Sequence, residues 1–571
     1  MTAHTMQLVI PMSGVGERFK RAGYRVPKPL IEVEGKPIIQ HVVELFPGVT
    51  DVVFICNEEH LRDPDLGLRR VLSDIAPMAR VVSVAPHRLG PVHAVREALR
   101  TPDLLDPSRP VIVNYCDFAC RWDFEHFVEF VRESGCEGCI PCYSGFHPHM
   151  LGSVNYAYVD VLRDVSGART LWGHRIQEKR PFTDDPTSEY ASSGTYYFAT
   201  AELMARCFDE VVARGLDVAG EYYVSLAYTP LLEASRPVAV YPLPHFMQWG
   251  TPEDLEEYRY WSDTFRELAR RPRQRAKQLG TTLIPMAGVG ARFGASTDLP
   301  KPLIEVAGVP MVLRALEDLP AAPQQRFVLG SHLAEVEELR ARLTNAAPAA
   351  SLRILSRPTE GQASTCLEGL DGVDLDAPLT IGACDHGSLY DDASFERAMA
   401  DAHTDVWVHC ARGYPLAARD PSAYGWVRAA DDGRILGVSV KAALTDPRSD
   451  PVIIGAFTFR RGRDFVASAE RMIARGARVR GEFYVDTCIE DAVALGLVCR
   501  VFEVDRYLCW GTPNDLRTFH YWQACFHQWS GHPYSLRHDA RVPADRVGRL
   551  EAAWRTAPPA IPHARDRPTR G

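Results

Sequence analysis

The sequence predicts an α/β protein built from two tandem doubly wound domains, each with a mixed, mostly parallel sheet. A chain of 571 residues is too long for one hydrophobic core. Residues 8–31 (LVIPMSGVGERFKRAGYRVPKPLI) have a close counterpart in residues 283–306 (LIPMAGVGARFGASTDLPKPLIEV). Gly288 follows Gly14 by 274 residues, which is a domain-sized period. In each half, short apolar segments alternate with helical patterns, as in a parallel sheet with crossover helices.

The repeat sets the expected domain limits. We expect domains at 1–264 and 281–545, joined by a basic, polar linker at 265–280. The tail at 546–571 is rich in Ala, Arg and Pro, so we predict that it is disordered.

Composition excludes several classes of protein. The chain is 46% hydrophobic and 24% charged, which is ordinary for a globular protein. Its net charge is −9 and it has no basic block, which argues against a nucleic-acid partner. No apolar run approaches the length of a membrane span, and the first residues do not resemble a signal peptide. We therefore expect a cytoplasmic protein without a membrane partner.

The 14 cysteines are scattered and are expected to be reduced and mostly buried. The spacing Cys136-x-x-Cys139-x-x-Cys142 raises the possibility of a metal site. No second Cys/His pair with zinc-finger spacing stands nearby in the sequence, so we favour free thiols there.

The first half supports a regular order of elements. Residues 8–10 form an apolar segment expected to be a buried strand, and 38–46 show the spacing of a helix that packs on a sheet. Further strands are expected at 51–57, 81–85 and 111–118. Ligands of such sheets bind beyond the carboxyl ends of the strands, where the loop after residue 10 is expected.

That loop has the composition of a phosphate-binding cradle. Gly14 and Gly16 allow backbone N–H groups to approach an anion, and a following helix would direct its positive end there. Arg18 offers a fork of donors, and Lys28 stands between two prolines that fix its backbone. Glycines alone also occur in tight strand-to-helix turns for steric reasons.

The combination G-x-G-x-R-F, followed about ten residues later by P-K-P-L, resembles the signature of sugar-phosphate nucleotidylyltransferases. The second half repeats it with Gly288, Gly290, Arg292, Phe293 and Lys301. The resemblance implies a Rossmann-like nucleotide-diphospho-sugar transferase fold (GT-A-like), used twice. It implies that Gly14, Gly16 and Arg18 bind the triphosphate and that Lys28 acts on the α-phosphate.

The family places a glycine-containing loop against the nucleotide base. Here the matching segments contain Gly90 in the first half and Gly361-Gln362 in the second. The two loops differ, so the two halves need not bind the same nucleotide. An ordinary turn into a helix is the alternative.

Two aspartates end matching strands, Asp117 in 111–118 and Asp385 in 379–387. A carboxylate facing the phosphate loop suits Mg²⁺, although a helix cap or turn is the alternative. The family often has a second aspartate two residues before a Gly-Thr-Pro, where this chain has Gln248 and Cys509. Cysteine is a poor ligand for magnesium, so Glu221 and Asp486 come into question as substitutes for that ligand.

Glu178-Lys179 resembles the family's pair that binds the acceptor and its phosphate, and Glu221 is a further candidate for acceptor binding. A surface ion pair is the alternative. The second half has Val440-Lys441, so its acidic partner is missing.

The resemblance implies transfer of a nucleoside monophosphate from an NTP to a sugar 1-phosphate, with release of pyrophosphate, for surface polysaccharide or glycan biosynthesis. Arg18, Lys28 and Lys179 would be catalytic. Alternatives are a cytidylyltransferase for a phosphocholine-like acceptor, an inactive nucleotide-binding regulator, and a glycosyltransferase. The last usually has Asp-x-Asp, whereas Asp117 is followed by Phe-Ala. We expect a working first half, a second half of different specificity or regulatory role, and possible homo-oligomers.

Overall fold

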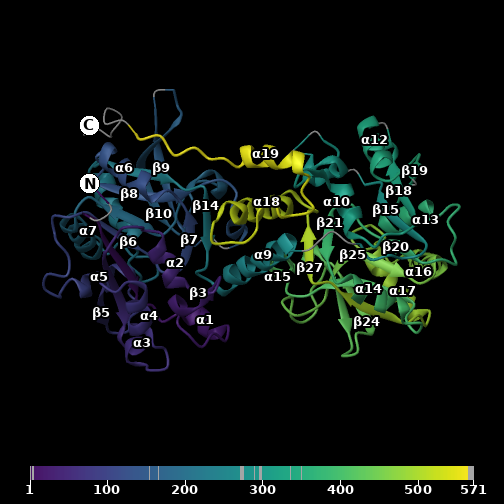
Figure 1. Cartoon of the computed structure of the whole chain (residues 1–571), viewed down its shortest axis with the longest axis horizontal. Helices are drawn as coiled ribbons and strands as arrows, with labels where there is room; N and C mark the ends of the chain where they lie inside the picture. Colours follow the sequence, from purple (N-terminus) through teal and green to yellow (C-terminus); the bar gives the residue numbers. More distant parts are fainter. Residues whose placement is uncertain are drawn as a thin grey trace. The chain divides into compact units, whose positions relative to one another are not determined.

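The computed structural model describes residues 2, 5–152, 155–164, 166–270, 275–288, 290–294, 297, 299–334, 336–348 and 350–562. The chain divides into two compact units (Figure 1), one of residues up to Arg259 with the segment from Arg555, the other Tyr260–Trp554. The boundary falls inside helix α9 (Pro252–Arg270). The predicted linker at 265–280 is therefore wrong at its start, which is helical; 271–274 lie outside the described residues.

The first unit is organised around a mixed ten-stranded sheet of order β11-β9-β10-β13-β8-β12-β6-β1-β4-β5. Strands β5, β4, β1 and β6 are mutually parallel, and β12 runs antiparallel to both β6 and β8. The strands are β1 (Gln7–Met12), β2 (Glu32–Val33), β3 (Lys36–Pro37), β4 (Asp51–Asn57), β5 (Arg80–Val84), β6 (Val111–Asn114), β7 (Phe118–Arg121), β8 (Gly138–Tyr143), β9 (Ala157–Arg163), β10 (Arg169–Glu178), β11 (Tyr190–Ser192), β12 (Thr195–Phe198), β13 (Val238–Pro242) and β14 (His245–Gln248).

Amphipathic helices cover this sheet. Their apolar positions join the strands in one core; Val95 on α5, Met204 on α7 and Val113 on β6 are at most 1% exposed. Side-chain caps define two helix starts, because Asp123 accepts from the His126 N–H and Thr200 from the Leu203 N–H. The helices are α1 (Glu17–Arg21), α2 (Ile38–Glu44), α3 (Glu58–Arg62), α4 (Leu68–Ile75), α5 (Gly90–Ala98), α6 (Phe124–Ser134), α7 (Ala201–Ala213) and α8 (Thr229–Glu233), with 3₁₀ turns η2 (Lys28–Leu30), η3 (Pro148–Leu151), η4 (Pro186–Ser188) and η5 (Val224–Tyr228).

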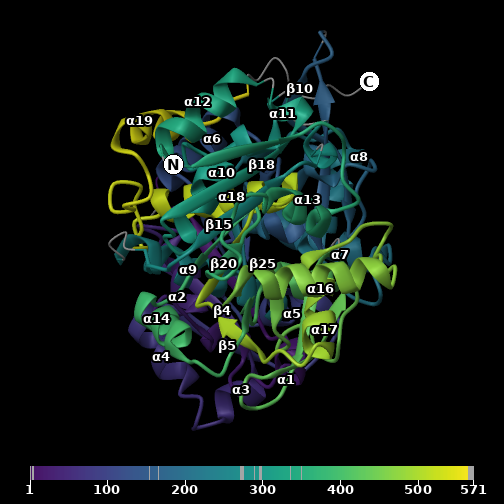
Figure 2. The same cartoon turned by 90° about the vertical axis from the view of Figure 1, so that its right-hand side faces the viewer.

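The second unit has the strand path β19-β18-β15-β20-β25-β22-β26, with β23 paired to β24 and β25. Figure 2 labels β18, β15, β20 and β25 of this path. In order and in pairing sense, this path matches β5-β4-β1-β6-β12-β8-β13 of the first unit. The strands are β15 (Thr281–Met286), β16 (Glu305–Val306), β17 (Val309–Pro310), β18 (Gln324–Gly330), β19 (Ser351–Leu355), β20 (Leu379–Ile381), β21 (His386–Leu389), β22 (Val406–Ala411), β23 (Gly425–Ala429), β24 (Ile435–Val440), β25 (Val452–Phe459), β26 (Cys499–Glu503) and β27 (Arg506–Cys509).

The helices of the second unit include one in the segment predicted to be a disordered tail. That prediction is wrong for 546–553, which lie in α19, whereas 563–571 lie outside the described residues. The helices are α10 (Met311–Asp318), α11 (Ser331–Ala334), α12 (Glu337–Ala346), α13 (Gln362–Gly369), α14 (Asp392–Ala400), α15 (Pro415–Arg419), α16 (Gly462–Ala474), α17 (Val485–Ala494), α18 (Pro513–Gln528) and α19 (Ala544–Ala553), with 3₁₀ turns η6 (Ala291–Phe293), η7 (Lys301–Leu303) and η8 (Pro421–Ala423).

Two further expectations concern the cysteines and the membrane. All 14 cysteines are free thiols and all but Cys384 are buried, as predicted. Cys139 and Cys142 lie within strand β8, and Cys136 just precedes it. Among the described helices, none combines the length and the apolar character needed to cross a membrane.

Candidate active site

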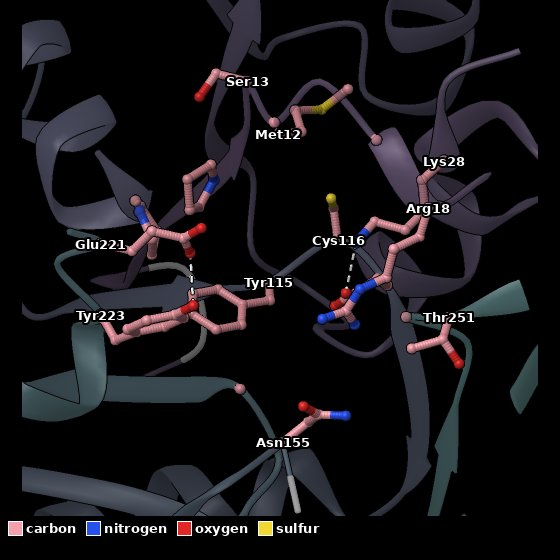
Figure 3. Close-up of a pocket in the computed structure, with 18 of the residues that line it drawn as sticks. Met12, Ser13, Arg18, Lys28, Tyr115, Cys116, Asn155, Glu221, Tyr223 and Thr251 are labelled. Atoms are coloured by element: carbon pink, nitrogen blue, oxygen red, sulfur yellow. Dashed lines mark hydrogen bonds and ion pairs between the residues drawn. The ribbon is translucent and has the colours of Figure 1, made fainter. Parts of the chain in front are cut away.

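A cavity of about 630 Å³ opens in the first unit, where strands β1 and β6 end. Its lining comes from the glycine loop after β1, the η2 turn, the segment after β6, the end of β10 and the segment after β14. Figure 3 shows Arg18 and Lys28 on one side of the pocket and Glu221 and Tyr223 on the other. The pocket therefore lies at the sheet edge that the sequence predicted.

The glycine loop is open toward this pocket. A Cβ atom on Gly14 would have no neighbour within 4 Å, and Gly16 has a φ of 67° as the residue that caps α1. Helix α1 is only five residues long, so its dipole is smaller than the sequence suggested. The positive charge of Arg18 acts on Lys28, on the same side of the cavity, and on Tyr223, on the other side. The backbone of this loop is therefore unobstructed, and the loop and Arg18 together suit an anion.

Lys28 and Asp117 form an ion pair, with 2.7 Å between Nζ and Oδ2. Their side chains are 24% and 23% exposed, so both remain accessible from the cavity. Burial alone would lower the pKa of Lys28, but the Asp117 carboxylate beside it outweighs that effect and raises it. Lys28 therefore stays charged.

Gln248 lies close to the same carboxylate. A Cβ atom on Gly250 would be 2.9 Å from Asp117 Oδ2 and 3.2 Å from Gln248 Nε2, so both side chains border this glycine. The Trp249 N–H donates to the Asp117 backbone carbonyl at 3.0 Å and fixes this segment against the end of β6. The neutral amide thus occupies the place where the family resemblance led us to look for a second acidic residue.

Glu178 and Lys179 each bond to another residue, and their predicted contact with an acceptor stays a prediction. The Ser225 hydroxyl donates to Glu178 Oε2 at 2.5 Å, whereas Lys179 donates to the Tyr223 hydroxyl. Tyr223 in turn donates to Glu221 Oε2 at 2.5 Å. Lys179 has a φ of 56°, a left-handed conformation that is strained for a residue with a side chain. Strand β10 ends at Glu178, directly before this residue.

The Glu178 carboxylate is held in an environment that disfavours its charge. Burial raises its pKa to about 7, while the bond from Ser225 and the charge of Lys179 act in the opposite direction. Ser225 and Tyr223 were missed by sequence reasoning. Their signal was present, because both lie in the motif GEYYVS, whose counterpart in the second half is GEFYVD.

Gly90 has a structural reason to be glycine. Its φ is 85°, and a Cβ atom there would lie 2.7 Å from the backbone N and O of Tyr222. Gly361 meets the backbone of Phe483 in the same way. Gly90 lines the cavity nonetheless, together with His87, whose Nε2 is 3.3 Å from Ser13 Oγ. The proposed contact of Gly90 with a nucleotide stays a prediction, since close packing already explains this residue.

The second unit repeats the central ion pair. Lys301 Nζ is 2.5 Å from Asp385 Oδ2 and 3.1 Å from the Gly511 carbonyl, and His386 Nδ1 is 3.2 Å from Asp385 Oδ1. Burial would raise the pKa of Asp385, but Lys301 and His386 hold it well below its usual range. The Cys509 thiol donates to Asp515 at 3.5 Å. Both oxygens of Asp385 are therefore engaged.

The other predicted residues of the second unit lie near this pair or at helix starts. Gly288 is open and Gly290 has a φ of 64°, with Lys301 Cβ 3.2 Å from where its own Cβ would be. Arg292 is exposed on η6, and Gln362 begins α13. Gly290 thus shares the left-handed backbone of Gly16, whose φ is 67°.

Backbone N–H groups and cations gather where parallel strands of this α/β unit end, an arrangement that suits an anion. Residues 8–180 match the family model described as the MobA-like NTP transferase domain.

The chain is similar to proteins whose names refer to nucleotide transfer or to nucleotide sugars. Mannose-1-phosphate guanyltransferase beta-B of Xenopus laevis is 29% identical over 35% of this chain and 51% of its own, so the chain spans about half of that relative. A nucleoside-diphosphate-sugar pyrophosphorylase from Vibrio cholerae RC9 aligns with a TM-score of 0.36 at 20% identity, over 42% of this chain and 98% of its own. The inositol-1-phosphate CTP transferase from T. maritima aligns with a TM-score of 0.35 at 14% identity, over 44% and 96%.

Proposed function

We propose that the first unit transfers a nucleoside monophosphate from an NTP to a phosphorylated small molecule, with a sugar 1-phosphate as the acceptor, and releases pyrophosphate. The observation that carries this proposal is the Lys28–Asp117 pair, which faces the open glycine loop across one cavity with Lys179. The name of the Xenopus relative supports a sugar 1-phosphate. The product, a nucleotide sugar, would supply glycan-forming transfer reactions.

The reaction joins two anions, so its barrier is lowered by neutralising charge and by alignment. A phosphate oxygen of the acceptor attacks the α-phosphorus of the NTP. The bond from that phosphorus to the bridging oxygen breaks, and pyrophosphate leaves with the electron pair. Backbone N–H groups near Gly14 and Gly16 and the guanidinium of Arg18 bind the triphosphate and stabilise the leaving pyrophosphate. Lys28 neutralises charge at the α-phosphate, as preorganised donors do.

Lys179 would hold the phosphate of the acceptor. Its ammonium donates to Tyr223, whose hydroxyl is anchored on Glu221, so its position is defined before a ligand binds. Glu178 lies on the same side and would accept hydrogen bonds from acceptor hydroxyl groups. We assign Glu221 to positioning Lys179, because it reaches the acceptor side through Tyr223.

Magnesium fits this site as an ion that oxygen atoms of both the protein and the substrate would coordinate. Mg²⁺ takes one or two protein oxygens and completes its shell with phosphates and water. Asp117 Oδ2 and the Gln248 side-chain amide border Gly250, which has no side chain to fill the space between them, and the amide oxygen of Gln248 would turn toward the ion. Glu221 and Asp486 are not needed as metal ligands on this view. When bound, the ion would supply further neutralisation of the phosphate charges.

We extend the proposal to the second unit as a second copy of the same domain. The matching strand path and the Lys301–Asp385 pair support this. Its oxygen ligands are fewer, because Asp385 is engaged on both oxygens and Cys509 replaces Gln248. We therefore assign catalysis to the first unit.

The test is pyrophosphate release with each of the four NTPs and magnesium, against sugar 1-phosphates and phosphocholine. Wild type is compared with Asp117→Ala and Asp385→Ala. We expect activity with a sugar 1-phosphate that is lost in Asp117→Ala and retained in Asp385→Ala. Activity with CTP and phosphocholine alone would replace the sugar acceptor with a non-sugar one. Tight NTP binding without release from any pair would refute the proposed catalysis.

A further inference from the structure

The residues on the acceptor side of the pocket in the first unit have counterparts in the second unit. In the first unit Ala157 pairs with Glu178 in the β9–β10 register, and the Lys179 N–H donates to the Tyr156 carbonyl at 2.9 Å. In the second, Gly425 pairs with Val440, and the Lys441 N–H donates to the Tyr424 carbonyl at the same distance. Lys441 has a φ of 62°, against 56° for Lys179. The two lysines are thus structurally equivalent.

The next element is equivalent as well. Tyr223 caps η5 with φ and ψ of −89° and 145°, and Tyr484 caps α17 with −90° and 149°. Two residues further on, the first unit has Ser225 and the second has Asp486. Ser225 is the residue whose hydroxyl bonds to Glu178 in the first unit. Asp486 therefore puts a carboxylate beside the place that the Glu178 carboxylate occupies in the first unit.

A third difference makes room for this carboxylate. A Cβ atom on Gly425 would overlap Asp486 Oδ2, and the equivalent residue of the first unit is Ala157. Glu178, Ser225 and Ala157 are thus replaced by Val440, Asp486 and Gly425. The carboxylate therefore comes from the end of a strand in the first unit and from the first turn of a helix in the second unit.

The Asp486 carboxylate lies under the influence of a lysine and an imidazole. Lys441 and His386 act on it electrostatically, and the Asp486 backbone N–H donates a hydrogen bond to it. Burial raises its pKa to about 6, against the effect of Lys441. A carboxylate in this environment gains from any ligand that donates hydrogen bonds to it.

His386 supplies an independent sign of a ligand. It takes the place of Phe118, since each opens the strand that pairs with the segment before Gly-Thr-Pro. The side chain is 8% exposed, and its Nε2 has no hydrogen-bond partner among the described residues. Its ring lies against Gly455, whose counterpart Gly194 lines the cavity of the first unit. An imidazole nitrogen left unpaired in a buried site costs free energy unless something binds it.

We propose that the second unit has an acceptor pocket of its own, in which Lys441 holds the phosphate of a hydroxylated small molecule and Asp486 replaces Glu178 in accepting its hydroxyl groups. His386 adds a polar group where the first unit has a phenyl ring. This inference rests on the proposed function, because that function defines which side of the pocket receives the acceptor. It assigns to Asp486 a role in ligand recognition, in place of the metal ligation considered from the sequence.

The test uses the full chain in a Lys179→Ala background, which removes the phosphate contact of the first unit. Mannose 1-phosphate, glucose 1-phosphate and inositol 1-phosphate are titrated calorimetrically with magnesium and each α,β-methylene NTP, in which the scissile bond cannot break. We expect binding of at least one of them to persist. Asp486→Asn should weaken it about 10–100-fold, as for loss of a hydrogen bond to a charged group. Glu490→Gln, an exposed carboxylate on the same helix, is the matched control.

A second variant covers the case in which Asp486→Asn fails to fold. A triple variant rebuilds the arrangement of the first unit within the second unit; it carries Gly425→Ala, Val440→Glu and Asp486→Ser. This variant should bind, at its second unit, the same acceptor phosphate that Lys179 binds in the first unit of wild type. Loss of all binding in Lys179→Ala, or equal residual affinity with and without Asp486→Asn, would overturn the inference. If the proposed function itself is wrong, the result is different. Wild type and Lys179→Ala would then bind the three phosphates with the same affinity, and neither would release pyrophosphate.

Discussion

Replacement of Lys28 by alanine tests the mechanism most directly. Lys28 Nζ lies 2.7 Å from Asp117 Oδ2, and at an effective dielectric constant of about 20 this pair has a gross Coulomb attraction of about 6 kcal/mol. The net value is smaller, because both side chains are about one-quarter exposed and are desolvated only in part. In the reaction the same ammonium faces the α-phosphate, where it acts as a preorganised donor.

Loss of one such donor typically costs 10²–10³ in turnover, or about 3–4 kcal/mol, which lies within the gross limit. We therefore expect Lys28→Ala to lower kcat for pyrophosphate release by about 10²–10³. Asp117→Ala should lower it too, and the double variant should lose less than the product of the two single losses, because the groups act as a unit.

Lys36→Ala is the control. Lys36 pairs with Glu44 at 2.8 Å, nearly the same separation, but both side chains are more than 40% exposed and lie away from the cavity. Such a surface pair is worth about 0–1 kcal/mol, so turnover should not change. A kcat for Lys28→Ala within about threefold of wild type, at saturating NTP and acceptor, would refute the role of Lys28. A large loss in Lys301→Ala instead would move catalysis to the second unit.

The remaining predictions concern glycines and pH. Gly90→Ala should destabilise the fold by about 1–3 kcal/mol in denaturant unfolding, because its Cβ would strike the Tyr222 backbone at a φ of 85°. Gly14→Ala, with open space around it, should leave stability nearly unchanged and weaken NTP binding. A larger loss of stability in Gly14→Ala than in Gly90→Ala would contradict the roles given to these two glycines. Affinity for the acceptor should rise between pH 6 and 8, as Glu178 ionises around pH 7, and this rise should be smaller in Glu178→Gln. Because the raised pKa lets the folded state keep a proton that the unfolded state has lost, stability should fall between pH 4.5 and about 7, and less so in Glu178→Gln.

The sequence predicted where the first site lies because the site depends on strand ends. Gln7 and Val111 are paired in the parallel register of β1 and β6, so the loop after β1 and Asp117 after β6 must meet at one edge. The direct pairing of Lys28 with Asp117, 89 residues apart, needed the structure. Spacing along the chain predicts at which edge of the sheet a residue lies, but it does not predict the rotamer of that residue's side chain.

The sequence could not show which residues Glu178 and Lys179 contact. Neighbours on a strand point to opposite faces, and Lys179 leaves the strand in a left-handed conformation. Their partners are therefore Ser225 and Tyr223, which come from a distant segment. No pattern of one or two letters could show that a serine 47 residues away faces the glutamate.

The same limit explains why the second half looked incomplete. Val440 in place of a glutamate indicates a lost function only if nothing else supplies the carboxylate. A glutamate at 440 beside Asp486 would put two carboxylates in one partly buried pocket, and like charges there are costly. Asp486 beside an alanine at 425 would clash. The three residues are thus compatible only as a set, and Lys441 and His386, whose Nε2 has no hydrogen-bond partner among the described residues, act on the carboxylate of that set. A domain that had only lost its acceptor site would have no need of such a combination, which is the physical argument for a second ligand rather than a silent copy.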